Sequence, residues 1–239
     1  MRRLVKQFVR SMGYEVRRYA PTSSESAQLT TILKFHGVNL VFDVGANTGG
    51  FGRYLREVGY RGEIVSFEPM AAAHESLLRS TAADRHWTAA TRAAIGAHDG
   101  EVEIHVAGNS ESSSILDMLE SHSTAAPTSA CVGKEMVPLR RLDTIAPAYL
   151  REESKLFLKI DTQGYEEQVL TGGQDTVARA LVAQLELSLV HLYAGQKLLE
   201  EMVAQMNSLG FSLWGTAPVF ADPLSGRMLQ MDGIFCRSN

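Results

Sequence analysis

Cysteine is scarce in this sequence of 239 residues: only Cys131 and Cys236 occur, far apart and without a C-x-x-C motif. Their scarcity excludes a disulfide scaffold and a cysteine-rich zinc site, and it favours a reducing compartment. Apolar runs are only a few residues long, well short of the roughly 20 residues that a membrane helix needs. Basic residues interrupt the N-terminus before an apolar region forms, so we expect no secretory signal.

Common catalytic signatures are also missing. The sequence has no G-x-S-x-G motif, which excludes the nucleophile elbow of the α/β hydrolases. It has no H-E-x-x-H motif, and its seven histidines do not pair at metal-binding spacing. We therefore look for a function that needs neither an activated serine nor a histidine-rich metal site.

Charge is unevenly distributed. The net charge is −4, but the first 20 residues carry six basic residues and one acidic residue, a net charge of +5. The other residues therefore carry −9, and an acidic body argues against a nucleic-acid partner. A local attraction of the N-terminus to an anionic surface stays open. We expect a cytoplasmic protein, with a peripheral position on the inner membrane face as the alternative for this basic segment.

We divide the chain into an N-terminal basic, amphipathic helical segment (1–36) and one larger domain (37–239). A helix from Met1 to about Tyr19 is predicted by the helical spacing of Leu4, Val5, Phe8, Val9 and Met12. Three roles are open for this helix: it lies on an anionic membrane, it packs on the domain, or it forms a lid over the active site. A second helix follows at 27–35, capped by Ser24 or Ser26.

Strands and helices alternate along the rest of the chain. This rhythm is typical of βαβ units and predicts an α/β fold with a parallel sheet. A hairpin of 101–106 with 136–139 interrupts the rhythm, and the loop between them (108–133) carries a polar cluster at 109–114. The predicted strands are 38–44, 63–67, 91–96, 155–160, 181–189, 211–214 and 229–236, and the predicted helices are 51–58, 70–80, 166–180 and 196–209.

A glycine turn follows the first of these strands, at Asp43-Val-Gly-Ala-Asn-Thr-Gly49. Glycine permits strained backbone angles there, and Glu68 ends the next strand, where a carboxylate can bind both ribose hydroxyls. A dinucleotide site of the G-x-G-x-x-G type needs glycine at position 47, which is Asn47. Asp43 suits a cation better than a phosphate, so S-adenosylmethionine fits this turn better than NAD. The alternative is a turn with only a structural role.

Four blocks of the sequence together resemble the FkbM-type S-adenosylmethionine-dependent methyltransferases. The blocks are Phe42-Asp-Val-Gly-Ala-Asn-Thr-Gly49, Phe67-Glu-Pro69, Arg140-Arg-Leu-Asp143 and Leu158-Lys-Ile-Asp-Thr-Gln-Gly-Tyr-Glu166. The resemblance covers about residues 38–236, and the Lys-Ile-Asp-x-x-Gly-x-Glu block is its most specific part. It implies a Rossmann-like class I methyltransferase: a mostly parallel seven-stranded sheet with an antiparallel last strand, with the hairpin as a small insertion.

The same resemblance implies the positions of the donor. The glycine turn would hold the amino-acid end of S-adenosylmethionine, the Glu-Pro pair its ribose, and residues after the third strand its adenine. The cofactor-binding residues implied are Asp43, Gly45, Ala46, Asn47, Gly49, Glu68, Pro69, Ala94 and Ile95. Asp143, in the Arg-Leu-Asp block, is predicted to anchor the chain.

Candidates for catalysis lie at the ends of the fourth and fifth strands. Asp161 is predicted as a general base, a metal ligand or an orienting group for the acceptor hydroxyl, with a structural role in the Gly164 turn as the alternative. Glu186 and His191 flank the end of the neighbouring strand and are the other candidate bases. Asp161 with Glu186 would suit Mg²⁺. Lys159 is interpreted as a charge at a strand edge.

We therefore predict an O-methyltransferase that transfers a methyl group from S-adenosylmethionine to a sugar hydroxyl. Its acceptor would be a small-molecule or lipid-linked sugar, in a glycolipid or a glycosylated natural product. No Asn-Pro-Pro-Tyr run follows the fourth strand, which argues against the enzymes that methylate amino groups of nucleic acids. The alternatives are an NAD-dependent oxidoreductase and a non-catalytic binding module with a methyltransferase fold.

Overall fold

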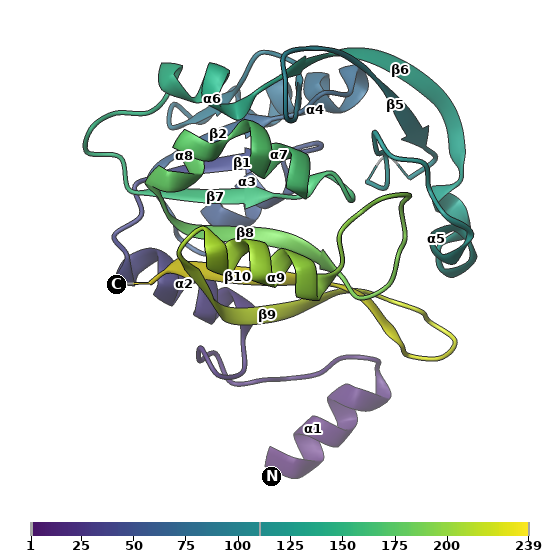
Figure 1. The fold of residues 1–239 in the computed structure, drawn as a ribbon. Helices are drawn as coiled ribbons and strands as arrows, with labels where there is room; N and C mark the ends of the chain where they lie inside the picture. Colours follow the sequence, from purple (N-terminus) through teal and green to yellow (C-terminus); the bar gives the residue numbers. More distant parts are fainter. Residues whose placement is uncertain (1, 110, 239) are drawn as a thin grey trace.

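A seven-stranded sheet lies at the centre of the protein in the computed structural model, which describes residues 2–109 and 111–238 (Figure 1). Met1 of the predicted N-terminal helix, Ser110 of the polar cluster and Asn239 fall outside the described residues, as do the side chains of Leu4 and Val5. In spatial order the strands are β3 (Trp87–Ala89), β2 (Glu63–Phe67), β1 (Leu40–Val44), β7 (Leu156–Ile160), β8 (Ala180–Ser188), β10 (Met228–Arg237) and β9 (Phe211–Ala221).

Most strand pairs in this sheet are parallel. The β1–β2, β1–β7, β2–β3 and β7–β8 pairs are parallel, whereas β10 runs antiparallel to both of its neighbours, β8 and β9. The last strand of the chain is thus inserted antiparallel between two others. The predicted fold class, an α/β Rossmann-like methyltransferase sheet of seven strands with an antiparallel last strand, is confirmed.

Helices cover both faces of the sheet, because each face carries its own apolar cluster. On one face, Leu33, Leu55 and Leu77 of the helices pack against buried side chains of β1, β2 and β7. On the other face, helices contribute residues such as Leu170 and Met206 to the larger cluster. The first group of helices is α2 (Glu25–Phe35), α3 (Gly50–Glu57) and α4 (Ala71–Thr81); the second is α6 (Leu142–Ile145), α7 (Glu166–Gly172), α8 (Gln174–Arg179) and α9 (Leu199–Ser208).

Local sequence explains where these elements begin. The Ser24 side chain accepts a hydrogen bond from the Ala27 N–H at 3.3 Å, so it caps α2 as predicted. All five residues of β1 are buried, including the charged Asp43. A central strand covered on both faces is expected to read as a continuous buried run.

A second sheet of three strands lies beside the first and holds the predicted hairpin. Its strands, in order, are β4 (Ala94–Ile95), β6 (Cys131–Arg140) and β5 (Gly100–Ala107). The β5–β6 pair is antiparallel, which confirms the hairpin, whereas β4 runs parallel to β6. The loop that joins β5 to β6 contains α5 (Glu120–Ala125) and a 3₁₀ helix at Pro127–Ser129.

The prediction of the third strand at 91–96 is wrong. The third strand of the main sheet is β3, where Trp87 pairs in register with Ile64 and its indole N–H donates to Ser66 Oγ at 3.0 Å. Ala94 and Ile95 instead form β4 of the second sheet. Three residues are too few to show a period, and β3 exists because β2 offers it a partner edge.

Two predicted helices are shorter than expected. The predicted helix at 166–180 is broken into α7 and α8 at Gly173, and a Cβ on the preceding Gly172 would lie 1.9 Å from the Gly96 carbonyl oxygen. The N-terminal helix, α1 (Arg2–Ser11), ends before Gly13, whose φ of +83° is left-handed. The break between α7 and α8 follows from close backbone contact, and the end of α1 follows from a reversal of the chain. The apolar pattern of the sequence defines neither end.

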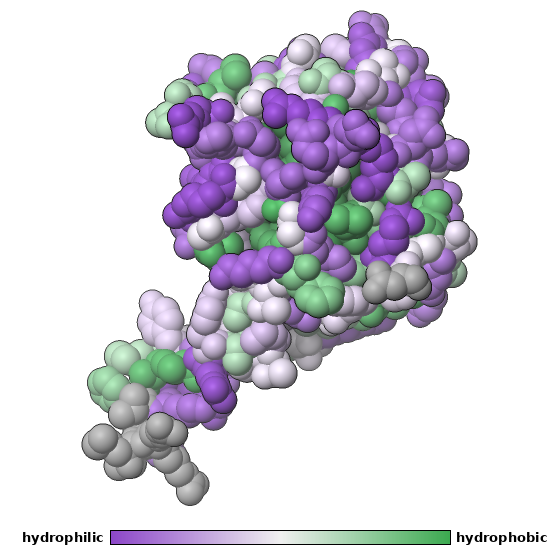
Figure 2. Space-filling model, turned by 90° about the vertical axis from the view of Figure 1, so that its left-hand side faces the viewer, coloured by the Kyte–Doolittle hydropathy of each residue, from purple (hydrophilic) through white to green (hydrophobic). Residues whose placement is uncertain are grey.

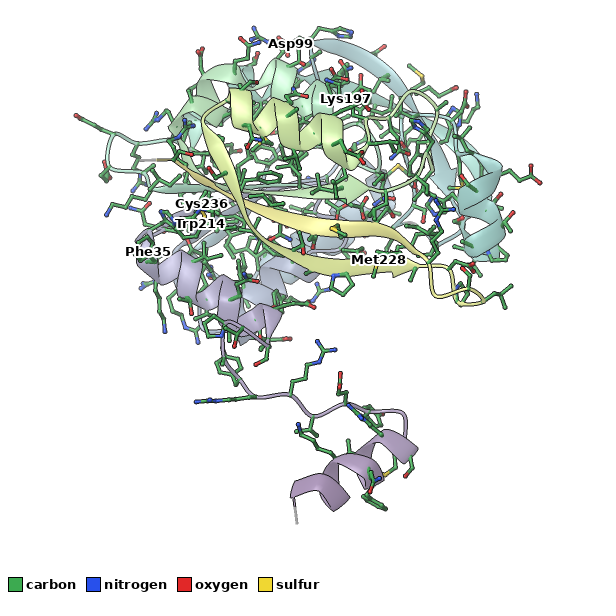
Figure 3. The ribbon with its side chains drawn as sticks, turned by 60° about the horizontal axis from the view of Figure 1, so that its bottom comes forward. Phe35, Asp99, Lys197, Trp214, Met228 and Cys236 are labelled. Carbon is green, nitrogen blue, oxygen red and sulfur yellow. The ribbon has the colours of Figure 1, made fainter. Side chains whose placement is uncertain are left out.

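The predicted boundary after residue 36 separates α2 from the sheet that it covers. Leu29, Ile32 and Leu33 of α2 belong to the same buried cluster as Val41 and Phe157 of the sheet. The residues before α2 extend away from the body, and α1 stands apart from it in Figures 1 and 3. In residues 2–109 and 111–238, no helix has the length and apolar character needed to cross a membrane.

Candidate active site

A cavity of about 650 Å³ opens at the carboxyl ends of the central parallel strands. Parallel α/β sheets bind their ligands at this edge, and the volume lies in the usual range of small-molecule sites, roughly 300–1,000 Å³. Its wall is built from the turn after β1, the end of β2, β4, the turn after β7, and facing residues of β8 and β10. Of the predicted cofactor-binding residues, those that line the cavity are Gly45, Ala46, Asn47, Glu68, Pro69, Ala94 and Ile95.

The turn after β1 depends on Gly45. Its φ is +81°, and a Cβ at this position would lie 1.8 Å from the Asp161 carbonyl oxygen. The N–H groups of Gly45 and Ala46 both donate to the Phe67 carbonyl at 3.0 Å, which fixes the turn beside the end of β2. Glycine is therefore required at position 45, because the turn after β1 comes too close to the turn after β7 to leave room for a Cβ.

Glu68 faces this turn from the end of β2. Its two carboxylate oxygens accept hydrogen bonds from the Asn47 N–H and the Met70 N–H, both at 2.8 Å. Burial raises the pKa of Glu68 to about 7, although these two N–H groups oppose the shift. Each carboxylate oxygen keeps a second lone pair, so Glu68 can still accept from the two hydroxyls of a ribose.

Asp43 and Gly49 lie outside the residues that line the cavity. Asp43 is fully buried; its carboxylate accepts from Ser66 Oγ at 3.2 Å and lies 3.6 Å from Lys159 Nζ. A Cβ on Gly49 would meet the Trp87 ring at 3.0 Å. In this structure both residues support the turn from behind, whereas Gly45, Ala46 and Asn47 line the cavity.

Lys159 is a buried cation, which corrects its interpretation as a charge at a strand edge. Only 7% of it is exposed, because β7 lies between β1 and β8. Burial alone would lower the pKa of Lys159, but Asp161, Asp43 and Asp232 outweigh it and raise the pKa above its ordinary value. Lys159 thus supplies the positive charge that balances the carboxylates at this strand end.

Asp161 lines the cavity at the end of β7, as predicted for a catalytic position. One oxygen is 3.1 Å from Lys159 Nζ, and the other accepts from Gln163 Nε2 at 3.0 Å. A third of the side chain is exposed. A held but accessible carboxylate of this kind can accept a proton from a hydroxyl that is bound in the cavity.

Gln163 joins Asp161 to Glu186. The Gln163 amide N–H₂ donates to both carboxylates at 3.0 Å, and its carbonyl oxygen accepts from the Tyr193 hydroxyl at 2.8 Å. Ser114 Oγ donates to the Gln163 backbone carbonyl at 2.7 Å, so the long loop after β5 is tied to this turn. Sequence reasoning missed Gln163, which has a φ of +55°, an unusual value for a residue with a side chain.

Glu186 lines the cavity from β8 but is buried, in contrast to Asp161. One of its oxygens accepts from Gln163 Nε2 and from Gln230 Nε2, the latter at 2.7 Å. Burial raises the pKa of Glu186 well above its ordinary value, and the neighbouring Asp161 adds to the shift. Burial therefore disfavours the charged form of Glu186, and Asp161, a third of whose side chain is exposed, is better placed as a general base.

A further carboxylate, Asp232, lines the cavity and was missed by sequence reasoning. It lies opposite Glu186 in the β8–β10 register and accepts from Gln184 Nε2 at 2.9 Å. Burial raises the pKa of Asp232 to about 6, with Lys159 acting against the shift. The sequence signal for it was the presence of polar Gln230 and Asp232 at alternate positions among apolar residues.

His191 does not reach this group. It is exposed, lies outside the residues that line the cavity, and is held through its backbone carbonyl by Ser121 Oγ at 2.5 Å. The structure therefore gives no support to His191 as the base. The exposed position arises because the chain leaves the sheet after β8, and Leu192 and Tyr193 take the buried positions instead.

The residues present do not fit Mg²⁺. In residues 2–109 and 111–238, no group of three histidine, cysteine, aspartate or glutamate side chains is arranged to hold a metal ion. Asp161 and Glu186 are joined through the Gln163 amide, and Lys159 already pairs with Asp161. The expected magnesium site is therefore not supported.

Other residues of the sequence blocks stabilise the turns around the cavity. Glu166 is buried, and its Oε1 accepts from the N–H groups of Thr162 and Gly164, at 2.9 and 3.2 Å. Asp143 accepts from the Thr176 N–H at 2.9 Å at the start of α8, so it anchors the chain as predicted. The most specific block thus combines one accessible carboxylate, Asp161, with the groups that hold its turn.

Solved structures with a similar fold are distant. The methyltransferase domain of a bacterial Hen1 (CtHen1-C) has 8% identity and a TM-score of 0.47, over 90% of this chain and 97% of that one. Magnesium protoporphyrin IX methyltransferase (ChlM) from Synechocystis PCC 6803 has 11% identity and a TM-score of 0.44, over 89% and 79%. TehB from Haemophilus influenzae has 9% identity and a TM-score of 0.46, over 88% and 62%.

The family of the chain follows from its sequence. No significant match is found among curated proteins, but one family model does match. The family described as the methyltransferase FkbM domain matches residues 43–213, from the buried Asp43 of β1 into β9. This match includes the glycine turn, Glu68, Asp161 and Glu186. Because it covers well over half of the sequence, the chain belongs to the methyltransferase FkbM domain family.

Proposed function

We propose that this methyltransferase transfers a methyl group from S-adenosylmethionine to a hydroxyl group of a sugar. The observation that carries the proposal is a single cavity with two kinds of wall. One wall combines the Gly45 turn with Glu68, and the other carries Asp161, Glu186 and Asp232. A donor bound at the first wall would present its methyl group to an acceptor held at the second.

The residues at the first wall suit S-adenosylmethionine. Glu68 offers a carboxylate to ribose hydroxyls, Ala94 and Ile95 give an apolar surface for adenine, and the Gly45 turn lines the cavity beside them. When bound, the donor supplies an activated methyl group on a cationic sulfur. Carboxylates around the cavity favour such a cation, and the side chain of Asn47 stands where a dinucleotide pyrophosphate would need glycine.

The second wall suits an alcohol acceptor. Amide and carboxylate groups of Gln163, Gln184 and Asp232 are the hydrogen-bonding groups that bind sugar hydroxyls in proteins. Asp161 would take the hydroxyl proton, while Lys159 and Gln163 hold its carboxylate in place. Much of the rate then comes from orientation of the oxygen, since the donor needs no further activation.

Cells that carry the gene and cells that lack it provide the test of the acceptor. We expect mass spectrometry of their glycans and glycolipids to reveal a species heavier by one CH₂ in the cells with the gene. The purified protein with S-adenosylmethionine should then convert the lighter species into the heavier one, with the new methyl on a sugar oxygen. Methylation only of nitrogen, or only of a non-sugar acceptor, would contradict the proposal.

Donor affinity should depend on pH through Glu68. Because its pKa in the free protein is about 7 and the ribose needs the ionised carboxylate, binding releases a proton. The ionised fraction rises about tenfold between pH 6 and pH 8, so we expect affinity for S-adenosylhomocysteine to rise about tenfold over this interval. Calorimetric titration at several pH values measures this.

The Glu68→Gln variant should lose that pH dependence and bind at least about tenfold more weakly, the value of one hydrogen bond to a charged group. Glu63→Gln is the matched control, since Glu63 is an exposed carboxylate at the opposite end of the same strand. If Glu68→Gln kept both the affinity and the pH profile of the unaltered protein, Glu68 would have no role in donor binding.

A further inference from the structure

Residues 2–19, which precede α2, form a basic, amphipathic segment that stands away from the domain in Figures 1 and 2. Half or more of the side chain is exposed at five large apolar positions: Phe8, Met12, Tyr14, Val16 and Tyr19. In Figure 2 the segment stands off the lower left of the body, with hydrophobic residues on its surface. A single exposed apolar side chain is ordinary, but five of them within 12 residues of one another indicate an interaction surface.

Positive charge accompanies these apolar side chains. The first 20 residues carry a net charge of +5, opposite in sign to the rest of the chain. Arg10 and Arg17 both pair with Glu15, at 3.0 and 2.7 Å, so the one acidic residue of the segment holds two cations side by side. The three side chains are well exposed, so these pairs contribute little to stability but leave the charge on the surface.

Helix α1 has ten residues, a length at which an isolated helix is marginal in water. A surface that takes up its apolar side chains would therefore stabilise it. We propose that residues 1–20 bind an anionic lipid surface, with Phe8 and Met12 in the acyl boundary and the arginines at the headgroups. An apolar helix face with interspersed arginines matches the chemistry of such interfaces, which combine apolar burial with attraction to acidic lipids.

The segment joins the body close to the cavity, which relates lipid binding by the segment to the candidate active site. Helix α2 begins only five residues after Ala20, and its residues Glu25 and Leu29 line the cavity. Val219, half exposed on β9, lines the same cavity. A lipid-bound segment would thus hold the cavity close to the membrane. That consequence rests on the proposed function, whereas lipid binding itself does not.

The test is co-sedimentation of the full chain with vesicles of phosphatidylcholine, alone or mixed with phosphatidylserine. We expect binding to the mixed vesicles only, and its loss at high salt, since exposed charges are screened. Arg10→Gln, Arg17→Gln and Arg18→Gln together should weaken binding about 100-fold, at about fivefold for each basic residue. The matched control neutralises three exposed arginines of the body, Arg79, Arg85 and Arg151, and should leave binding unchanged.

The apolar contribution has its own variants. Phe8→Ser with Met12→Ser should weaken vesicle binding at least about tenfold, whereas Leu78→Ser with Val132→Ser, at exposed positions of the body, should not. The proposal would be overturned if the chain bound vesicles made only of phosphatidylcholine. It would also be overturned if the segment variants and the body variants bound mixed vesicles equally well. A dimer that Phe8→Ser dissociates, without vesicle binding, would also overturn it and make the segment a contact between two copies of the chain.

Discussion

Replacing Asp161 by asparagine should lower kcat by about 100-fold or more while donor affinity changes little. The substitution keeps the size of the side chain and its bond from Gln163 Nε2, but it removes the charge that would accept the hydroxyl proton. Asp161 is the best placed of the three predicted candidates, since it lines the cavity and a third of its side chain is exposed. Single-turnover methyl transfer to the sugar acceptor measures the effect.

Two companion variants make the result specific. His191→Ala should retain near-normal turnover, because His191 is exposed and lies outside the cavity wall. Glu186→Gln should cost less than Asp161→Asn, because burial raises the pKa of Glu186 whereas Asp161 is partly exposed in the cavity. A nearly normal kcat in Asp161→Asn, with an unchanged melting temperature, would leave Asp161 with a structural role in its turn.

Replacing Lys159 by methionine should lower the free energy of unfolding by about 3–5 kcal/mol, the cost of leaving a buried charge without its partner. Asp43 is fully buried with its carboxylate 3.6 Å from Lys159 Nζ, and a carboxylate oxygen of Asp161 lies 3.1 Å from the same nitrogen. Methionine fills a similar volume, so the loss reports on charge rather than on packing. Urea unfolding at neutral pH gives the value.

A double variant separates charge balance from general damage. Asp43→Asn combined with Lys159→Met should be more stable than Lys159→Met alone, because it removes the carboxylate that lost its partner. Lys155→Met, at an exposed lysine just before β7, is the control and should change stability by less than about 0.5 kcal/mol. A loss below about 1 kcal/mol in Lys159→Met, or no recovery in the double variant, would contradict this account of the cation.

The donor side of the site could be predicted from the sequence because its signals are local. The glycine turn directly follows an apolar strand, and Glu68 directly follows the next one, so both must lie at one edge of a parallel sheet. Seven of the nine implied cofactor-binding residues line the cavity, and Asp43 and Gly49 support the turn instead. The side chain of a residue in a strand can point to either face of the sheet, and the sequence pattern around Asp43 does not define which face its side chain takes.

The acceptor side depends on contacts between distant parts of the chain. Asp232 faces Glu186 only because β10 inserts antiparallel beside β8, a register that its own sequence does not contain. Lys159 looks like a charge at a strand edge until β7 is placed in the middle of the sheet. Likewise, the three residues of β3 form a strand because Trp87 finds a partner in β2.

Calorimetric titration of the full chain with S-adenosylhomocysteine and with NAD⁺ tests the central claim most directly, that this cavity is a methyl-donor site. We predict one binding site for S-adenosylhomocysteine, competition by S-adenosylmethionine, and no heat of binding with NAD⁺. NAD⁺ that binds and displaces S-adenosylhomocysteine would contradict the donor site, as would the absence of S-adenosylhomocysteine binding by folded protein at pH 8.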